Sequence, residues 1–278
     1  MSKIRLGPAG IPLGCIGGTL EGVRYAAGEG LSAFEVEFVR GVRMGTEAAT
    51  KVGEAARERD VLLSCHCPYW INCCAKDPKK IEIAKRNLLE TARVAHAMGA
   101  WIAVFHPGYY MGRSPEEAGK LVKQTLTDVL GQMRAEGIGD VWLGAETAGK
   151  VSQYGTLDEV IGLSAIPGVM PVVDFAHIHA RGGGSLKGRK EYTVILDRLE
   201  EVGGPLGAGK RGWHCHFSGI EFTDKGERKH LPIESESPPF KPLAEELADR
   251  NIAITIISES PLLDMDALRM REIIASIG

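Results

Sequence analysis

Short apolar runs rich in β-branched or aromatic residues alternate along the chain with longer stretches whose apolar residues recur at helical spacing. The short runs predict eight strands, at residues 4–6, 33–38, 61–65, 101–105, 141–145, 169–173, 212–217 and 252–257. The longer stretches predict eight helices, at residues 20–27, 46–57, 79–98, 115–135, 157–164, 191–202, 242–249 and 265–276. Each predicted strand is therefore followed by a predicted helix.

This alternation of strands and helices is typical of an α/β protein with a parallel sheet. The strand runs are apolar almost throughout, which indicates strands that are buried on both faces. Eight such units in 278 residues predict a single (β/α)8 TIM barrel. No linker or shift in composition divides the sequence, so we expect one domain that spans residues 1–278.

Six of the predicted strands end in a histidine or a carboxylate, which are His66, His106, Glu146, Asp174, His216 and Glu259 in chain order. Taken alone, such a residue more often caps a turn or supports a neighbour than binds a ligand. The active site of a TIM barrel, however, lies at the C-terminal ends of its strands. Six such residues in one register, with His177 and His230 in the same regions, therefore predict a site. Imidazoles and carboxylates suit zinc or another divalent first-row metal, and this many donors indicates a multinuclear metalloenzyme.

The composition limits the possible partners. With 44% hydrophobic and 25% charged residues, the chain can bury a large core. The formal net charge of −3 gives no basic signature, so any contact with nucleic acid must come from local basic loops. The N-terminus lacks a signal-peptide core and no segment approaches a membrane span, so we expect a cytoplasmic protein, and a monomer. The six cysteines form no CxxC pair, which predicts packed thiols.

Several short motifs follow one another in the order and spacing of a known family. They are His66-Cys67-Pro68-Tyr69-Trp70-Ile71-Asn72, Phe105-His106-Pro107-Gly108, Glu146-Thr147-Ala148-Gly149, Val173-Asp174-Phe175-Ala176-His177 and Glu259-Ser260-Pro261. With these motifs the chain resembles endonuclease IV, the zinc-dependent apurinic/apyrimidinic endonuclease of the xylose-isomerase-like barrel superfamily, over nearly its whole length. Each string is weak alone, but their order and spacing together are fairly specific.

The resemblance implies a set of metal ligands. Glu146 would bridge two zinc ions, with His66 and His106 on the first ion. The second ion would be held by Asp174, His216 and Glu259, and a third by His177 and His230. The implied content is two to three zinc ions per chain, with manganese as the other possible metal. A hydroxide held between two metals is a nucleophile at neutral pH, and a third cation stabilises the leaving oxygen of a phosphodiester.

The resemblance also implies the reaction and the contacts to DNA. The reaction would be cleavage on the 5′ side of an abasic site in base-excision repair, with Glu146 or Glu259 orienting or deprotonating the attacking water. Tyr69 and Trp70 stand where family members enter the duplex at the missing base. The alternative is that these aromatic residues pack the barrel rim or contact a small substrate. Arg40 and Arg43 after the second strand, and the basic run 181–190 after the sixth, are predicted to contact phosphates.

The chain departs from the family pattern after the seventh strand. The family has Asn-Asp shortly after the strand histidine, whereas this sequence has Ser218-Gly219. The family's third-metal motif is Asp-Arg-His, but Arg228 stands where the carboxylate should lie, and Glu227 is one residue out of register. Three outcomes are open: a bulge lets Glu227 reach the metal, Asp224 takes its place, or the third site is weak or lost. His214 and His179 are further candidates, as ligands or, by preference, as supporting neighbours of His216 and His177.

Two other functions compete with the nuclease. A sugar or sugar-phosphate isomerase or epimerase of the same superfamily needs one divalent metal, for which Glu146, Asp174, His216 and Glu259 suffice. That enzyme does not need the four further histidines as ligands, and this surplus favours the nuclease. The third hypothesis is a metal- or nucleic-acid-binding module without catalysis, which the altered loop after the seventh strand suggests.

Overall fold

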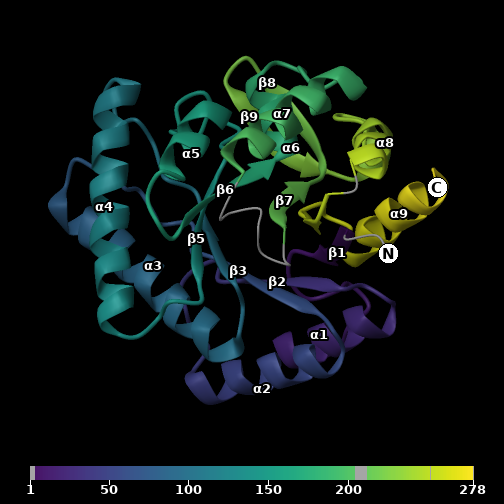
Figure 1. Cartoon of the computed structure of the whole chain (residues 1–278), viewed down its shortest axis with the longest axis horizontal. Helices are drawn as coiled ribbons and strands as arrows, with labels where there is room; N and C mark the ends of the chain where they lie inside the picture. The colour runs from purple at the N-terminus through teal and green to yellow at the C-terminus, as the bar shows by residue number, and fades with distance from the viewer. Residues whose placement is uncertain (1–3, 204–211, 251, 278) are drawn as a thin grey trace.

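The computed structural model describes residues 4–203, 212–250 and 252–277, and its centre is a barrel of parallel strands (Figure 1). Eight strands pair in the order β1-β10-β7-β6-β5-β4-β3-β2. They are β1 (Ile4–Pro8), β2 (Ala33–Glu37), β3 (Leu62–His66), β4 (Ile102–Phe105), β5 (Trp142–Glu146), β6 (Val169–Asp174), β7 (Trp213–Phe217) and β10 (Ile254–Ser258). The predicted TIM barrel is confirmed.

The barrel closes where β1 meets β2. A parallel bridge joins Ala9 to Glu35, and the amide of Gly10 donates to the carbonyl oxygen of Glu35 at 2.9 Å. A Cβ on Gly7 would lie 1.9 Å from the carbonyl oxygen of Ala33, so only glycine permits this approach of the two strands. Closure removes the exposed edges of the sheet and brings the ends of all eight strands onto one face.

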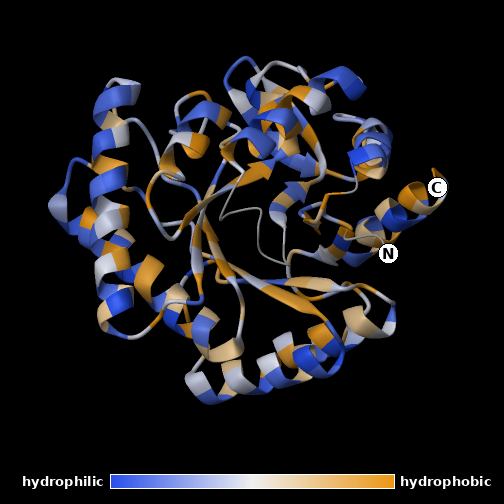
Figure 2. Ribbon diagram, in the orientation of Figure 1, coloured by the Kyte–Doolittle hydropathy of each residue, from blue (hydrophilic) through white to orange (hydrophobic). Residues whose placement is uncertain are grey.

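Helices surround the barrel and turn their apolar sides toward it (Figures 1 and 2). Those with predicted counterparts are α1 (Thr19–Gly28), α2 (Thr46–Glu58), α3 (Pro78–Met98), α4 (Pro115–Ala135), α5 (Leu157–Leu163), α7 (Arg189–Val202), α8 (Lys241–Arg250) and α9 (Asp264–Ala275). The side chains of Asp77, Ser114 and Thr156 accept hydrogen bonds from backbone amides and begin α3, α4 and α5. The helices thus begin at capping residues that can be read from the sequence.

Four elements between β6 and α8 were not predicted. They are the short helix α6 (Phe175–Arg181), the antiparallel hairpin of β8 (Gly219–Thr223) and β9 (Gly226–Leu231), and the 3-10 turn η1 (Ile233–Ser235). The hairpin sequence is mostly polar, so it lacks the apolar run that marked the barrel strands. The structure therefore corrects the prediction in one region, and that region borders the predicted third metal site.

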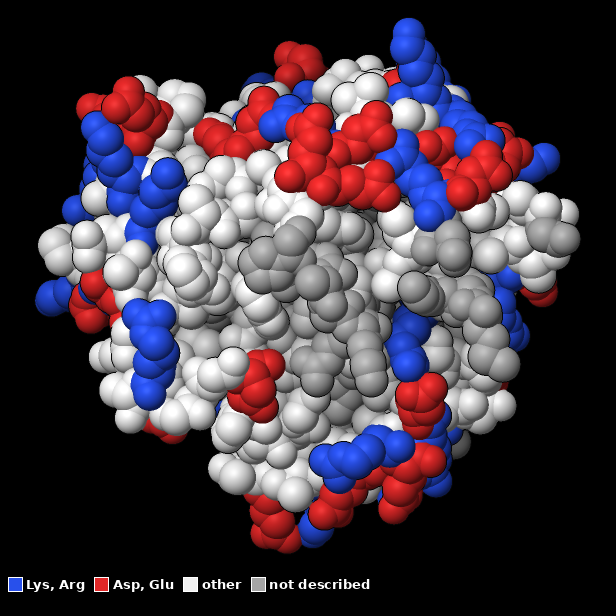
Figure 3. Space-filling view, in the orientation of Figure 1, with Lys and Arg blue, Asp and Glu red and all other residues white. Residues whose placement is uncertain are grey.

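The surface carries charges of both signs. Lysine and arginine side chains are interspersed with aspartate and glutamate around the rim of the face shown in Figure 3, in keeping with the net charge of −3. Five of the six cysteines are buried, and all six are free thiols. Among the described helices, none has the length and apolarity that crossing a membrane requires.

Candidate metal centre

The predicted ligands converge on Glu146, which is fully buried at the end of β5. Its Oε2 lies 3.2 Å from Nε2 of His66 and 3.3 Å from Nε2 of His106. Its Oε1 lies 3.1 Å from Nδ1 of His216 and 3.3 Å from Nδ1 of His177. One carboxylate thus faces four imidazoles that come from β3, the end of β4, β7 and α6.

Among the described residues, five groups of donor atoms have members that lie within 4.8 Å of one another; two of these groups contain Glu35, and the other three consist of predicted ligands. The first group is His66, His106 and Glu146, the second is Glu146, Asp174, His216 and Glu259, and the third is His177, His230 and Glu259. We call these the first, second and third metal positions. Glu146 belongs to both the first and the second group, as a bridging ligand would. Imidazole and carboxylate groups at these spacings suit divalent first-row metals.

In several histidines one ring nitrogen is engaged in a hydrogen bond, which leaves the other nitrogen free to bind a metal. Nδ1 of His66 donates to the main-chain carbonyl oxygen of Cys67 at 2.9 Å. Nδ1 of His177 donates to the main-chain carbonyl oxygen of Thr147 at 3.0 Å. Nδ1 of His230 lies 2.8 Å from the hydroxyl of Ser218, the residue at which the sequence departs from the family. In each case Nε2 remains available to a metal, and such outer contacts fix the ring orientation that metal ligands need.

Asp174 both caps a helix and faces the cluster. Its Oδ1 accepts a hydrogen bond from the amide of His177 at 2.7 Å and so begins α6. Its Oδ2 is buried without a hydrogen-bond partner among the described residues. A buried polar oxygen without a partner is costly, so the free Oδ2 fits a bound cation.

The hairpin places Glu227, not Arg228, at the cluster. Glu221 pairs with Lys229 and the next residue of β8 pairs with Glu227, so Arg228 is the extra residue of a β-bulge. Arg228 turns outward and pairs with Glu221. Oε2 of Glu227 lies 3.6 Å from Nε2 of His177, whereas Asp224 lies exposed at the turn. The bulge therefore places a second carboxylate beside His177 of the third metal position, although the sequence register is shifted by one.

The carboxylates create a field that attracts cations. Burial disfavours the charge of Glu146, but His106 and His216 hold the pKa of its carboxyl well below the usual range. Burial also opposes the charged form of His66, yet Glu37 and Glu146 raise its pKa to about 10. At His106 burial prevails and lowers the pKa to about 4, so this ring gives up its proton to a metal more readily than His66 does. The residues present therefore fit a metal cluster both in donor type and in charge.

The cluster opens into a cavity of about 680 Å³ and an adjoining groove of about 920 Å³. Tyr69 lines both spaces, and Trp70 lines the groove; their surfaces are 64% and 67% exposed. Arg40 and Arg43 line the groove as well, and neither forms an ion pair with any described residue. All four residues are therefore exposed; Tyr69 lies between the cavity and the groove, and the other three line the groove.

Comparison with known proteins identifies the family. The sequence profile of the xylose isomerase-like TIM barrel family matches residues 23–274. The chain belongs to this family. An uncharacterized protein of Methanocaldococcus jannaschii is 36% identical over 238 residues, which are 86% of this chain and 85% of that one. A probable endonuclease 4 of Mycoplasma mobile is 29% identical over 142 residues, which are 49% of this chain and 47% of that protein.

The barrel superposes on solved structures of proteins of two kinds. Endonuclease IV from Thermus thermophilus superposes with a TM-score of 0.72 at 20% identity, covering 97% of this chain and 99% of that one. A D-tagatose 3-epimerase-like protein superposes with a TM-score of 0.66 at 17% identity, covering 89% and 88%. At such identities these likenesses establish the fold, and the donor set must distinguish the activities.

Two carboxylates of this family member escaped the sequence analysis. Glu35 and Glu37 lie on β2, and Glu37 lines the cavity. Burial, reinforced by Glu35 and Glu259, raises the pKa of Glu37 to about 8. The signal was available: two glutamates separated by one residue stand within an otherwise apolar strand run, so both face the inside of the barrel.

The two further histidine candidates have different surroundings. His214 lies inside the barrel and bonds to Glu35, whose other carboxylate oxygen faces His216. His179 lies on α6, so the chain is not extended there, and its Nδ1 accepts a hydrogen bond from the amide of Leu186 at 3.0 Å.

Arg181, from the basic run that was predicted to contact phosphates, donates from its guanidinium to the main-chain carbonyls of Lys150 and Gln153. It holds a loop and is not free to contact phosphates.

Metal binding by this xylose isomerase-like barrel is expected to release protons. The pKa of His66, raised to about 10, means that the ring carries a proton near neutral pH which a metal must displace. At lower pH, protons compete more strongly with zinc for the ring nitrogen of His66. The zinc affinity should therefore rise with pH between about pH 6 and 9. Calorimetric zinc titrations in buffers of different ionisation enthalpy would measure the released protons. A zinc affinity that stays constant over this range would contradict the expectation.

Proposed function

We propose that this protein is a metal-dependent DNA endonuclease that hydrolyses the phosphodiester on the 5′ side of an abasic site. The observation that carries the proposal is the surplus of histidines. The second metal position alone would serve a single-metal isomerase. His66, His106, His177 and His230 line the same cavity, together with Glu227. A binding site for one small sugar has no need of so many additional donors.

Zinc is the metal that this donor set favours, with two to three ions per chain. His66 and His106 would hold one ion and Asp174, His216 and Glu259 another, with Glu146 between them. His177 and His230 would hold the third, with Glu259 and the neighbouring Glu227 as its carboxylates. Divalent ions bound there would polarise the phosphodiester and lower the pKa of water. That chemistry suits phosphate-ester hydrolysis.

The side chains supply the remaining parts of the reaction. Although burial opposes the charge of Glu259, His216 lowers the pKa of its carboxyl to about 2, so it stays ionised and can accept a hydrogen bond from the attacking water. Lys150 is the one lysine or arginine among the described residues that line the cavity, and it lies 3.9 Å from Glu227. Its ammonium is placed to contact a phosphate oxygen of the substrate.

The groove beside the cavity supports DNA as the substrate. It combines the cationic residues Arg40, Arg43, Lys80 and Arg86 with the exposed aromatic rings of Tyr69 and Trp70. Cations track a phosphate backbone, and an exposed aromatic ring can fill the space of a missing base. The probable endonuclease 4 relatives are consistent with this substrate.

A duplex that carries one abasic site tests the proposal. Protein whose zinc content has been measured should cut this duplex immediately 5′ of the lesion, leave the undamaged duplex intact, and lose the activity when a chelator removes the metal. Zinc-loaded protein that leaves the abasic duplex uncut would exclude this function. The product end is read on a sequencing gel against a synthetic marker with a 3′-hydroxyl.

A sugar or sugar-phosphate isomerase or epimerase is the second candidate. It is favoured by one observation, the compact second metal position with its four donors. One manganese or magnesium ion per chain, together with interconversion of a ketose, would support it. Zinc at two or more positions without effect on sugars would count against it. Metal analysis and NMR of the sugar products distinguish the two activities.

Substitutions in the groove are expected to weaken DNA binding. Trp70→Ala should raise the dissociation constant roughly tenfold through loss of stacking. Arg43→Gln should also weaken binding and lower the salt dependence by about one phosphate contact. Arg57→Gln removes a charge from an exposed position in the last turn of α2, beside the start of β3 and so at the opposite end of the barrel from the groove, and serves as the matched control. Fluorescence anisotropy with a non-cleavable abasic duplex measures these effects, and equal affinities for the two arginine variants would contradict the prediction.

A further inference from the structure

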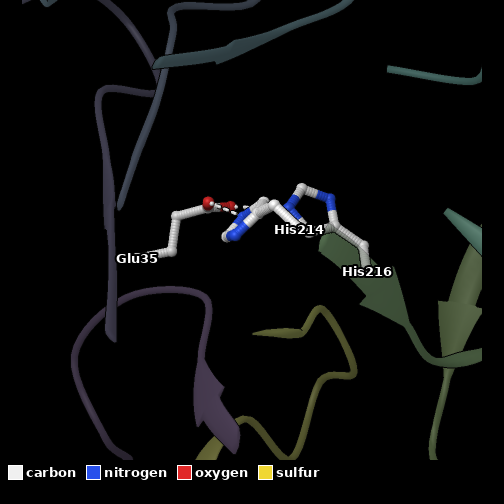
Figure 4. A group of neighbouring side chains, drawn as sticks. All are labelled: Glu35, His214 and His216. Carbon is white, nitrogen blue, oxygen red and sulfur yellow. Dashed lines mark hydrogen bonds and ion pairs between the residues drawn. The ribbon is translucent and has the colours of Figure 1, made fainter. Parts of the chain in front are cut away.

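Glu35, His214 and His216 form a contact group inside the barrel (Figure 4). The proposed function gives a role to His216 but none to Glu35 or His214. Glu35 reaches from β2 toward two imidazoles of β7, and all three residues are fully buried. Oε2 of Glu35 accepts a hydrogen bond from Nε2 of His214 at 2.9 Å. Oε1 lies 2.9 Å from Nε2 of His216, which is an ion-pair distance, but neither atom has a hydrogen-bond partner among the described residues.

The burial of Glu35 needs an explanation. No lysine or arginine forms an ion pair with it in the part of the chain that the structure describes. A carboxylate buried without a lysine or arginine partner is unfavourable, so its position in the barrel core points to a role beyond packing. Its contacts are imidazole N–H groups, and one of these imidazoles belongs to the second metal position.

The two nitrogens of His216 face different partners. Nε2 faces Glu35, while Nδ1 lies 3.1 Å from Oε1 of Glu146 and 3.2 Å from Oε1 of Glu259. A neutral imidazole carries one proton, so a ring that carries this proton on Nε2, facing the carboxylate, presents the lone pair of Nδ1 to the metal position. Carboxylates that hold a ligating imidazole in this way fix its tautomer and increase its basicity.

We infer that Glu35 is a positioning residue that holds His216 with Nε2 protonated and Nδ1 directed at the second metal position, and that His214 holds Glu35 in place. The inference rests on the metal-dependent function proposed above. It predicts a selective effect: the second metal position depends on Glu35, whereas the first does not, because His66 is oriented by a main-chain carbonyl instead. Glu35 thus sets the metal affinity of one position within a shared cluster.

The substitution Glu35→Gln tests this role with little change of shape. An amide has one acceptor oxygen where the carboxylate has two, so one of the two imidazoles must face an NH2 group. Zinc titration of metal-free protein against a chromophoric chelator should show one position weakened about 10–100-fold and the remaining positions unchanged. In zinc-loaded protein, ¹⁵N–¹H NMR of the imidazoles should show the Nε2–H signal of His216 displaced.

Two buried hydroxyls provide matched controls. Ser64 pairs in register with Glu35, and Thr255 pairs with His214, yet their hydroxyls make no hydrogen bond to a described residue. Ser64→Ala and Thr255→Val therefore change a buried polar group beside the contact group without touching His216. Both variants should bind zinc with wild-type affinity at every position.

The outcomes separate this inference from a structural role and from the proposed function. A purely structural role for Glu35 would lower the melting temperature of the metal-free variant and leave zinc affinity unchanged; that result overturns the inference. The inference is supported if Glu35→Gln lowers the zinc affinity of the second metal position while the melting temperature of the metal-free variant is unchanged or higher. If Glu35→Gln fails to fold, His214→Gln should still weaken the same position, by less, and unchanged affinity there overturns the inference. The readout uses zinc alone, so failure to cut abasic DNA would reject the proposed function and leave this inference standing.

Discussion

Replacing Glu259 with glutamine is expected to lower the turnover of abasic DNA by about 10³-fold or more. The carboxylate contributes to the second and third metal positions, and its Oε1 lies 3.2 Å from Nδ1 of His216. The amide keeps the size of the side chain but loses the negative charge that binds a cation and accepts a proton. Single-turnover cleavage of a labelled duplex, with zinc content measured in the same sample, gives the effect.

The fold should survive this substitution. Glu259 follows β10, and its amide donates to the carbonyl oxygen of Phe217 at 3.2 Å, a main-chain contact that glutamine retains. The melting temperature of the metal-free protein should therefore change by no more than about 4 °C. Glu47→Gln on the exposed surface of α2 is the matched control and should cleave normally. Full activity of the Glu259 variant would refute the site proposed above.

The barrel could be predicted from the sequence because its local signals agree with one another. Apolar runs mark each barrel strand, and capping residues such as Ser114 and Thr156 mark where helices begin. The hairpin of β8 and β9 gave no such signal. Its strands are polar and pair only with each other, so nothing in the hydrophobic pattern distinguishes them from a loop.

The site could be predicted only where its residues end a strand. His66 and Glu146 are the last residues of β3 and β5, and the barrel rule places such residues together. Glu35 lies in the middle of β2, and its importance depends on which side chains of β7 face it across the barrel interior. Strand spacing predicts which way a side chain faces, but contact across the barrel depends on shear and closure, which sequence spacing does not contain.

The position of Glu227 depends on the bulge in the hairpin and is the part of the site that the sequence left open. Without the bulge, Arg228 would occupy the position at which Glu227 approaches His177. A cation there would repel a metal, whereas the bulged arrangement pairs Arg228 with Glu221 on the outer side. One extra residue in a strand therefore decides the sign of the charge at the third metal position.

The substitution Glu227→Gln is accordingly expected to remove the third ion and lower turnover by about 10²–10³-fold, because the charge on the leaving oxygen loses its stabilising cation. Zinc content should fall by one ion per chain while the first two positions keep their affinity. Arg228→Gln is the matched neighbour: it breaks only an exposed ion pair, so zinc content and cleavage rate should stay within about twofold of wild type. Metal analysis after dialysis and single-turnover cleavage measure both variants. An arginine variant as impaired as the glutamate variant would mean that the bulge does not set which residue serves the metal, and the third position would have to be assigned to other donors.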